Sequence, residues 1–555
     1  MDITVEKMKA RVAGLKQERT LYEQKWKDIR DYICPGTTAF PEEENLEVDS
    51  EDDAILNTVP SVAHRVLTSG MQAGLTSPSR PWFRLDVPDI RLSEFPPVQT
   101  WLKKAQDSMY MVYAKSNFYD STQNLYGQLG GPGTGAMSMF PDFEHVIRSR
   151  TYSAGSYWIS NNASGRVDTF CREWYMTTAQ AVEEFGYDKV SSAIRYAYDR
   201  GDYFRQWKVI QLIEPNRSVI KGAYGWKGKP YVSLWWEDGG NTKDFLRIGG
   251  FSIFPVLCPR WFTADNKVYA RSPSWTALPD CKMLMKLEES INLGFDRIVD
   301  PPITAPSSAE GKIDTLPGGI SYYDEQVGTK GIHSLFEHMN PPIPALDAKV
   351  SKLEEHIKTV FFNDLFLMIS MMDRSGTTAR EIAAKEGEKL IMLGPVIERT
   401  KSEMLDPCID ITFDIAFKAG LIPPPPPELE GVPLNVDYIS ILAQAQKMIG
   451  LSAMNELVAN IGSLIGIGKA EVIDKLDADQ YIDETARMLG IPPGVIVSDE
   501  EVAKIRQMKA QRAAQTEALQ QGQAMAEGAK SLSETPIGDK NALEALMDMT
   551  GGGVM

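Results

Sequence analysis

Cysteine is scarce in this chain and is not arranged for a shared role. Five cysteines are spread over 555 residues, and no two of them form a C-x-x-C pair. This spacing indicates neither a disulfide framework nor a zinc finger. We therefore expect buried, reduced thiols, because free cysteine behaves as a small apolar residue. The cysteines are Cys34, Cys171, Cys258, Cys281 and Cys408.

Long apolar runs are missing as well. No window reaches the roughly eighteen uninterrupted apolar residues that a membrane-spanning helix needs. The most apolar region, Ile449 to Gly468, carries Asn455, Glu456 and Asn460. The first residues, M-D-I-T-V-E-K, lack the basic and apolar regions of a secretory signal. We expect a protein made in the cytoplasm of its host, with no membrane partner.

The sequence lacks the common catalytic motifs. No G-x-x-x-x-G-K-[S/T] string occurs, and the stretches Gly222 to Lys229 and Gly462 to Lys469 have the wrong spacing. There is no G-x-S-x-G elbow, and no short carboxylate pair stands out. His333 and His338 lie five positions apart, so neither a helix nor a strand would place them on one face. We expect no catalytic residue, no metal, no cofactor and no ATP hydrolysis by this chain.

The charge balance is acidic. The formal net charge is −17, whereas a protein that grips duplex DNA gathers Lys and Arg. Repulsive walls would suit a conduit that lets DNA pass without holding it. Plain solubility explains the charge equally well. The stretch from Pro41 to Asp53, with eight acidic residues and no basic one, is either a solvated loop or a negative patch facing DNA or a basic partner.

The N-terminal half has an α+β pattern. Apolar spacing predicts helices over residues 1–33, 56–74 and 98–115. Alternation predicts strands between 146 and 175, over 208–213 and 231–236, and over 245–261, joined as an antiparallel meander. Thr177 and Gln180 form a capping-box pattern for a helix over 179–185.

Two glycine-containing stretches need separate interpretations. In L-T-S-G-M-Q-A-G-L-T-S-P-S-R-P-W-F-R-L-D, from Leu67 to Asp86, small residues would let a neighbouring helix approach, and the prolines then turn the chain into a strand. The run G-G-P-G-T-G, from Gly130 to Gly135, is not spaced as a phosphate-binding loop. We interpret it as a flexible turn or a close-packing element.

The C-terminal half is mainly helical. Helices are predicted over 275–299 and 346–362, and they flank a long irregular excursion over 303–344, a length that is usually functional. A methionine-rich segment over 363–372 is followed by Asp373 to Gly376 and by a helix over 378–393. The five prolines from Pro423 to Pro427 predict a domain boundary. Residues 436–489 and 498–530 are predicted to be helical.

Several of these strings together resemble one family. They are L-K-Q-E-R-T-L-Y-E-Q-K-W-K-D-I-R-D-Y from Leu15, the stretch from Leu67, A-K-S-N-F-Y from Ala114, the glycine run, Phe254-Pro255 with Pro259-Arg260-Trp261, V-Y-A-R-S-P-S-W-T-A-L from Val268, and T-T-A-R-E-I-A-A-K-E-G-E-K-L-I-M-L-G-P from Thr377. In this order they resemble the portal proteins, or head-to-tail connectors, of short-tailed bacteriophages. The resemblance runs from Arg11 to Pro423 and is poor beyond the proline run.

The resemblance implies a portal-type fold, α+β and mainly helical. Its expected parts are a wing over 1–274, a first stem helix over 275–300, a clip over 301–345, and a second stem helix with the approach to a channel loop over 346–372. C-terminal wing helices over 373–422, a helical crown over 423–497, and a polar helix with a disordered tail over 498–555 complete it.

The resemblance also implies a virion protein at the capsid's portal vertex. The expected assembly is a ring of twelve subunits through which double-stranded DNA passes during packaging and ejection. The expected partners are the large terminase, tail adaptor proteins, and the major capsid and scaffolding proteins. The alternatives are another virion structural protein, such as a tail adaptor or minor capsid protein, and a metal-dependent enzyme.

The resemblance assigns roles to three sets of residues. In each case an ordinary solvent-exposed or packing role is the alternative. The channel loop would hold Met371, Met372, Asp373, Arg374 and Ser375. The stem residues that would contact DNA phosphates are Lys282, Lys286, Arg297, Lys349 and Lys352. The clip residues that would dock terminase or tail proteins are Glu310, Lys312, Asp314, Tyr322 and Tyr323.

Overall fold

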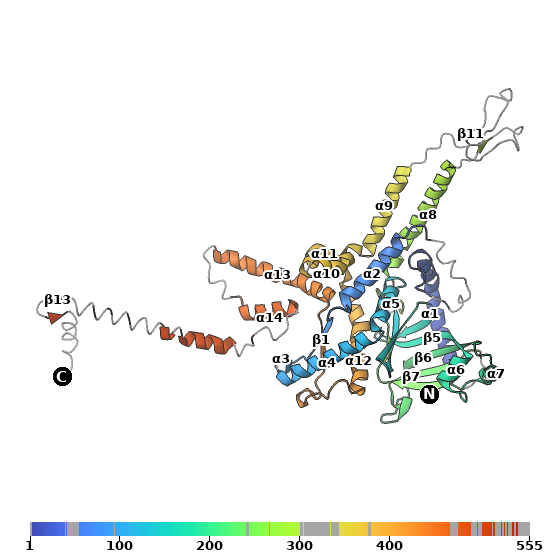
Figure 1. The fold of residues 1–555 in the computed structure, drawn as a ribbon, viewed down its shortest axis with the longest axis horizontal. Helices are drawn as coiled ribbons and strands as arrows, with labels where there is room; N and C mark the ends of the chain where they lie inside the picture. Colours follow the sequence, from blue (N-terminus) through green and yellow to red (C-terminus); the bar gives the residue numbers. More distant parts are fainter. Residues whose placement is uncertain are drawn as a thin grey trace, which may run out of the picture. The chain divides into compact units, whose positions relative to one another are not determined.

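The computed structural model divides the chain into two compact units. These are Met1–Val458 and Ala459–Met555, and each is described by itself. The described part is α+β and mainly helical, as predicted (Figure 1). The described residues are 3–38, 40, 55–93, 95–239, 244–265, 267–299, 303–304, 333–334, 343–375, 379–466, 475–489 and 497, with short stretches between 502 and 541.

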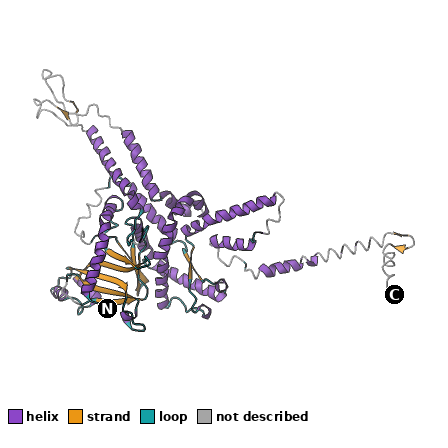
Figure 2. Ribbon diagram, turned by 180° about the vertical axis from the view of Figure 1, so that it is seen from behind, coloured by secondary structure: helices purple, strands orange, loops and turns teal. Residues whose placement is uncertain are grey.

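A long N-terminal helix covers one face of the main sheet. In α1 (Val5–Tyr32), Val12 and Leu15 lie on one side of the helix and are buried. They pack in one cluster with strand residues that include Trp158 and Trp236. Figure 2 shows this helix lying across the strands. The helix predicted over 1–33 is confirmed.

The main sheet is the predicted antiparallel meander, with strand order β4-β5-β6-β7-β8. Ile210 on β6 faces α1, while Val209 faces the opposite side, because successive strand residues alternate between faces. Helices α6 (Thr178–Phe185) and α7 (Ser192–Asp199) cover that opposite side. The strands are β4 (Tyr157–Asn161), β5 (Val167–Thr177), β6 (Gln206–Pro215), β7 (Tyr231–Glu237) and β8 (Arg247–Phe251).

Two local predictions in this region have different outcomes. The capping box of Thr177 and Gln180 is present at the start of α6. The single strand predicted over 245–261 is wrong, because β8 ends at Phe251 and the next strand joins a second sheet of order β3-β2-β9. Pro255 lies at this change of sheet, where it cannot donate a ladder hydrogen bond. The second sheet contains β2 (Ala136–Asp142), β3 (Val146–Tyr152) and β9 (Val256–Leu257).

The small residues of α2 (Val59–Leu75) form a packing face, as the sequence predicts. A Cβ on Gly70 would lie 2.4 Å from Phe366, and a Cβ on Gly74 would lie 2.6 Å from Leu442. Only a residue without a side chain permits this approach. The strand predicted after the helix is β1 (Phe83–Asp86).

Two long helices, α8 (Pro273–Val299) and α9 (Ile343–Val360), run side by side and away from the sheet (Figures 1 and 2). We call α8 and α9 the long pair. The apolar seam between them includes the buried Leu284 and Ile357. The helix predicted over 275–299 is confirmed, and α9 ends two residues before the predicted Phe362. Between the two helices the structure describes only β10 (Ile303–Thr304) and its partner β11 (His333–Ser334).

Beyond the long pair, one helix extends further than predicted. α11 (Ala379–Thr400) continues through Pro395, although the sequence predicts an end at Leu393. A proline inside a helix removes one backbone hydrogen bond. Here Val396 and Ile397 are buried in the main apolar cluster, and this packing outweighs the loss. The neighbouring elements are α10 (Asn363–Ser375), the π-helix η5 (Lys401–Leu405) and α12 (Asp406–Lys418).

The proline run lies inside the larger unit, because the chain on both sides of it packs there. The Trp101 indole donates a hydrogen bond to the Pro423 carbonyl at 2.9 Å. Directly after the run, β12 (Asn435–Tyr438) pairs antiparallel with β1, so the helix predicted from residue 436 is wrong at its start. The structure divides at Val458 rather than at the prolines.

The remaining elements complete the two units. None of the helices in the described ranges is long and apolar enough to cross a membrane. These elements are α3 (Ile90–Ser93), α4 (Pro96–Lys115), α5 (Phe118–Gly130), η3 (Gly225–Gly228), η6 (Pro427–Leu429), α13 (Ile441–Gly466), α14 (Ala478–Leu489), β13 (Pro536–Ile537) and β14 (Lys540–Asn541).

Candidate functional site

The start of α8 is bonded directly to the glycine run. Ser274 donates a hydrogen bond to the Gly130 carbonyl at 2.8 Å, and Ser272 donates to the Gly131 carbonyl. The Trp275 indole donates to the Pro132 carbonyl at 3.1 Å. Three consecutive carbonyls are therefore satisfied by side chains from the first residues of α8 and the turn before it. We call residues 130–135 and 272–275 the α8 anchor.

Side chains in the glycine run would crowd this anchor. A Cβ on Gly130 would lie 2.6 Å from Leu67, and one on Gly135 would lie 2.6 Å from Leu125. Gly133 has a φ of +99°, and its Cβ would lie about 3.0 Å from the backbone of residues 270–272. Of the two interpretations that the sequence left open, the close-packing element is the one found.

The glycine run also accepts hydrogen bonds from the N-terminal helix and from the main sheet. The Trp26 indole on α1 donates to the Pro132 carbonyl at 3.2 Å. The Tyr157 hydroxyl on β4 donates to the Thr134 carbonyl at 2.9 Å. Strings that lie far apart in the sequence, and that carry the portal resemblance, therefore meet in one buried junction below the long pair.

Arg260 links this junction to the C-terminal helices. Its guanidinium is 4% exposed and donates from Nε to both Glu403 oxygens, at 3.1 and 3.2 Å. It also donates to Asn161 Oδ1 at 3.1 Å and to the Gly165 carbonyl at 2.7 Å. A planar guanidinium suits this two-point contact with a carboxylate, and the additional acceptors offset its burial.

The end of α9 is held differently from the start of α8. Phe362, between α9 and α10, has a φ of +55°, a left-handed conformation that is costly for a residue with a side chain. Further along the pair, the Asn57 amide donates to Glu288 on α8 at 2.8 Å and to Glu354 on α9 at 2.9 Å. A single neutral amide thus separates two carboxylates and joins the two helices.

His64 lies between the glycine run, which holds the start of α8, and Phe361 at the end of α9. Its Nε2–H donates to the Gly127 carbonyl at 2.9 Å, and its ring meets Phe361 edge-on at 6.3 Å. Burial lowers the pKa of His64, because a charge in this apolar site would lose its hydration. The ring is therefore neutral near pH 7 and acts as a packing and hydrogen-bonding group.

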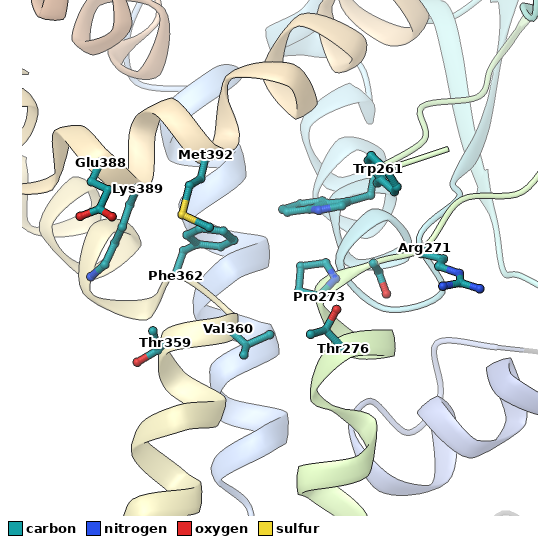
Figure 3. A pocket seen from close by; sticks show the side chains of 12 residues that line it. Trp261, Arg271, Pro273, Thr276, Thr359, Val360, Phe362, Glu388, Lys389 and Met392 are labelled. Carbon is teal, nitrogen blue, oxygen red and sulfur yellow. The ribbon is translucent and has the colours of Figure 1, made fainter. Parts of the chain in front are cut away.

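A cavity of about 670 Å³ opens beside this region. Figure 3 shows Phe362 and Met392 on one side of it and Trp261, Pro273 and Thr276 on the other. It lies where the start of α8, the end of α9 and α11 come together. Its lining is mainly apolar. In the described ranges, no group of three His, Cys, Asp or Glu side chains is placed to hold a metal ion.

The predicted stem lysines have unequal surroundings. Lys282 forms an ion pair with Asp28 at 2.9 Å and lies over the Tyr32 ring at 5.0 Å, so it packs α8 against α1. Lys286, Lys349 and Lys352 are exposed on the long pair. Nothing is described of the Arg297 side chain.

The backbone of the residues predicted for a channel loop is helical. Met371, Met372, Asp373, Arg374 and Ser375 are the last residues of α10, which ends at Ser375. The next described element, α11, begins at Ala379. The predicted clip residues Glu310, Lys312, Asp314, Tyr322 and Tyr323 lie outside the described residues, as does the acidic stretch over 41–53.

Asn57 and His64 were not selected from the sequence. Asn57 falls within the helix predicted over 56–74, whereas α2 begins only at Val59, and no spacing connects Asn57 to Glu288 and Glu354. No sequence pattern relates His64 to Gly127. All five cysteines are buried free thiols, as predicted, and burial raises the pKa of Cys34 and Cys408 to about 12.

Comparison with known proteins identifies the family. The model of the bacteriophage head to tail connecting protein family matches residues 5–497. The chain is 39% identical to the portal protein of Salmonella phage epsilon15 over 548 residues, 98% of each chain. It is 38% identical to a protein described as a probable portal protein of Bordetella phage BPP-1, over 98% of this chain and 97% of the relative.

The chain therefore belongs to the bacteriophage head to tail connecting protein family, and the resemblance to portal proteins is confirmed. Among solved structures it is similar to a chain in the neck of an empty gene transfer agent particle. That similarity covers 79% of this chain and 91% of the other, at 11% identity and a TM-score of 0.35.

Proposed function

We propose that this chain is the subunit of a closed ring at one capsid vertex, the channel through which double-stranded DNA enters and leaves the head. The observation that carries the proposal is the anchored long pair in a member of the head-to-tail connecting family. In a ring, each subunit meets its neighbours through two different surfaces. Identical long pairs side by side would then surround a central passage.

The exposed lysines of the long pair suit a passage that contacts DNA only weakly. Lys286, Lys349 and Lys352 would offer isolated positive charges, and the pair also carries exposed carboxylates such as Glu289 and Glu355. A lining with both charges would give few lasting phosphate contacts. Lys282 is less suited to this role, because its charge is paired with Asp28.

Two further assignments rest on the family resemblance. The segment over 301–345 would dock the large terminase and later the tail adaptor proteins. The end of α10 and residues 376–378 would face the DNA. The chain would act without catalysis, so a separate motor would hydrolyse ATP during packaging.

The ring is tested by native mass spectrometry of the purified protein, with negative-stain images of the same sample. The expected result is a closed ring of about twelve copies with a central hole. A compact dimer or tetramer without a channel would overturn the proposal. Scaffolding protein is added to a second sample, so that a monomer in the first sample is not mistaken for the final state.

The channel is tested with rings that still assemble. Replacing Lys286, Lys349 and Lys352 by Gln should leave the ring intact and change the rate of DNA packaging or its retention. Lys103, Lys104 and Lys115, exposed on α4, provide the matched control, with the same change of charge outside the long pair. Packaging and retention unchanged in the first variant would argue against a DNA-facing role for these lysines.

A further inference from the structure

The loop that joins β6 to β7 is basic in an acidic chain. Residues 216–230 include Arg217, Lys221, Lys227 and Lys229 and contain no Asp or Glu. Lys229 donates to the Ser252 hydroxyl at 2.7 Å. Lys221 and Lys227 are exposed and form no ion pair with any carboxylate in the described part of the chain. Lys221 and Lys227 therefore offer positive charge that no carboxylate in the described ranges neutralises.

The same loop exposes apolar side chains. Tyr224 is 101% exposed, Ile220 is 58% exposed and Val219 is 41% exposed. One exposed apolar residue on a surface is ordinary, but three beside unpaired lysines form a patch with two kinds of binding group. Tyrosine is among the residues that contribute most to protein–protein binding energy.

The loop is held in shape by Asn216, which is 8% exposed. Its amide donates to the Trp226 carbonyl at 3.1 Å and to the Lys229 carbonyl at 3.0 Å, and its Oδ1 accepts from the Ser218 backbone at 3.0 Å. The backbone hydrogen bond from Ile220 to the Lys227 carbonyl, at 2.8 Å, closes the loop. A loop fixed in this way presents Tyr224 and the lysines without a large ordering cost on binding.

We propose that this loop, residues 216–230, is a docking surface for an acidic protein segment that also carries apolar side chains. Carboxylates on the partner would be attracted to Lys221 and Lys227, and an apolar side chain would pack against Ile220 and Tyr224. A protein is favoured over a nucleic acid because phosphates would leave Val219 and Ile220 unused. The proposal does not depend on the ring or on the DNA channel.

The test measures binding of a fluorescent peptide of repeated Glu-Glu-Leu units to the full-length protein, by fluorescence anisotropy at low and high salt. The unmodified protein should bind the peptide more weakly as salt is added. The double variant K221E/K227E should weaken binding at least about tenfold, and Tyr224→Ala should weaken it about tenfold. All of these side chains are exposed, so thermal unfolding of the variants should match that of the unmodified protein.

Matched controls come from elsewhere on the same unit. K103E/K104E makes the same charge change on α4, and Phe143→Ala removes an aromatic ring that is 112% exposed at the β2–β3 turn. Both should leave peptide binding within about twofold. The proposal is overturned if the unmodified protein does not bind the peptide, if a Lys-Lys-Leu peptide binds equally well, or if the controls weaken binding as much as the loop variants. Stronger loop-dependent binding to duplex DNA or to anionic phospholipid vesicles would also overturn it, in favour of another class of ligand.

Discussion

The two helices of the long pair are joined to the body of the protein in opposite ways. α8 begins in a buried junction, where Ser272, Ser274 and Trp275 bond to consecutive carbonyls of the glycine run. α9 is followed by Phe362, which has a left-handed backbone conformation and lies beside a cavity. The Asn57 amide links α9 to α8 through hydrogen bonds to Glu354 and Glu288. In this antiparallel pair of helices, α8 is thus held by hydrogen bonds at its start, whereas α9 is held mainly by packing and by its contacts with α8.

The largest expected effect comes from disturbing the α8 anchor. Gly133→Ala should destabilise the folded protein by about 3 kcal/mol or more, because it adds a side chain at positive φ and forces it against the backbone of residues 270–272. The measurement is chemical unfolding. Gly165→Ala is the control, since Gly165 also has positive φ but has nothing within 4 Å of its Cβ. Equal losses for both variants would show that the anchor is not tightly packed.

A smaller effect should separate the two helices. Asn57→Ala should cost about 1–2 kcal/mol, because Glu288 and Glu354 lose their shared donor and face each other. Hydrogen exchange should speed up in α9 more than near the start of α8. Asn57→Asp should be worse than the alanine variant, since it adds a third carboxylate. Equal acceleration along both helices would mean that α8 is not more firmly held.

The stability of the folded protein should depend on pH through His64. His64 is neutral in the folded state because burial lowers its pKa, whereas the unfolded chain takes up a proton below about pH 6.5. The unfolded state then binds more protons, so this residue removes stability as pH falls, by up to about 1.4 kcal/mol per pH unit. His64→Gln keeps an N–H donor for Gly127 and cannot titrate. Its unfolding free energy should therefore fall less than that of the unmodified protein between pH 7 and pH 5, and parallel pH profiles would contradict the assignment.

The smallest effect tests the α9 end. Phe362→Gly and Phe362→Ala both remove the ring, so their difference reports the backbone conformation. At the left-handed φ of +55°, the glycine variant should be about 1 kcal/mol more stable than the alanine variant. In the middle of a helix the order is reversed, with glycine less stable by a similar amount. Thermal unfolding of the two variants gives the sign directly, and a more stable alanine variant would show that α9 and α10 are continuous.

Periodic segments were predicted well from the sequence. The meander, α1 and α8 follow from spacing that repeats over many residues. The errors occur where distant packing decides the outcome. β12 forms because β1 lies beside it, and α11 passes Pro395 because its next side chains are buried. Neither partner lies near the segment in the sequence, so no local pattern could have indicated it.

The candidate site was predicted only in part. Apolar spacing predicts the two helices of the long pair close to their observed bounds, and the glycine run is a close-packing element, one of its two predicted interpretations. The hydrogen bonds that turn the glycine run into an anchor come from Trp26, Tyr157 and residues 272–275, and sequence spacing does not relate these positions. The resemblance places Lys282 among the stem residues that would contact DNA, and no sequence pattern relates Lys282 to Asp28, with which it forms an ion pair.

The sequence by itself determined the family, the α+β class and the two long helices, because motif order and apolar periodicity are properties of the chain. Only the tertiary structure decided which of those helices is anchored, which lysines of the pair are exposed, and where the units divide. These depend on contacts between segments far apart in the chain, such as Asn57 with Glu354 or Arg260 with Glu403. Such contacts contribute to stability only once the chain has folded and excluded water from the groups that form them.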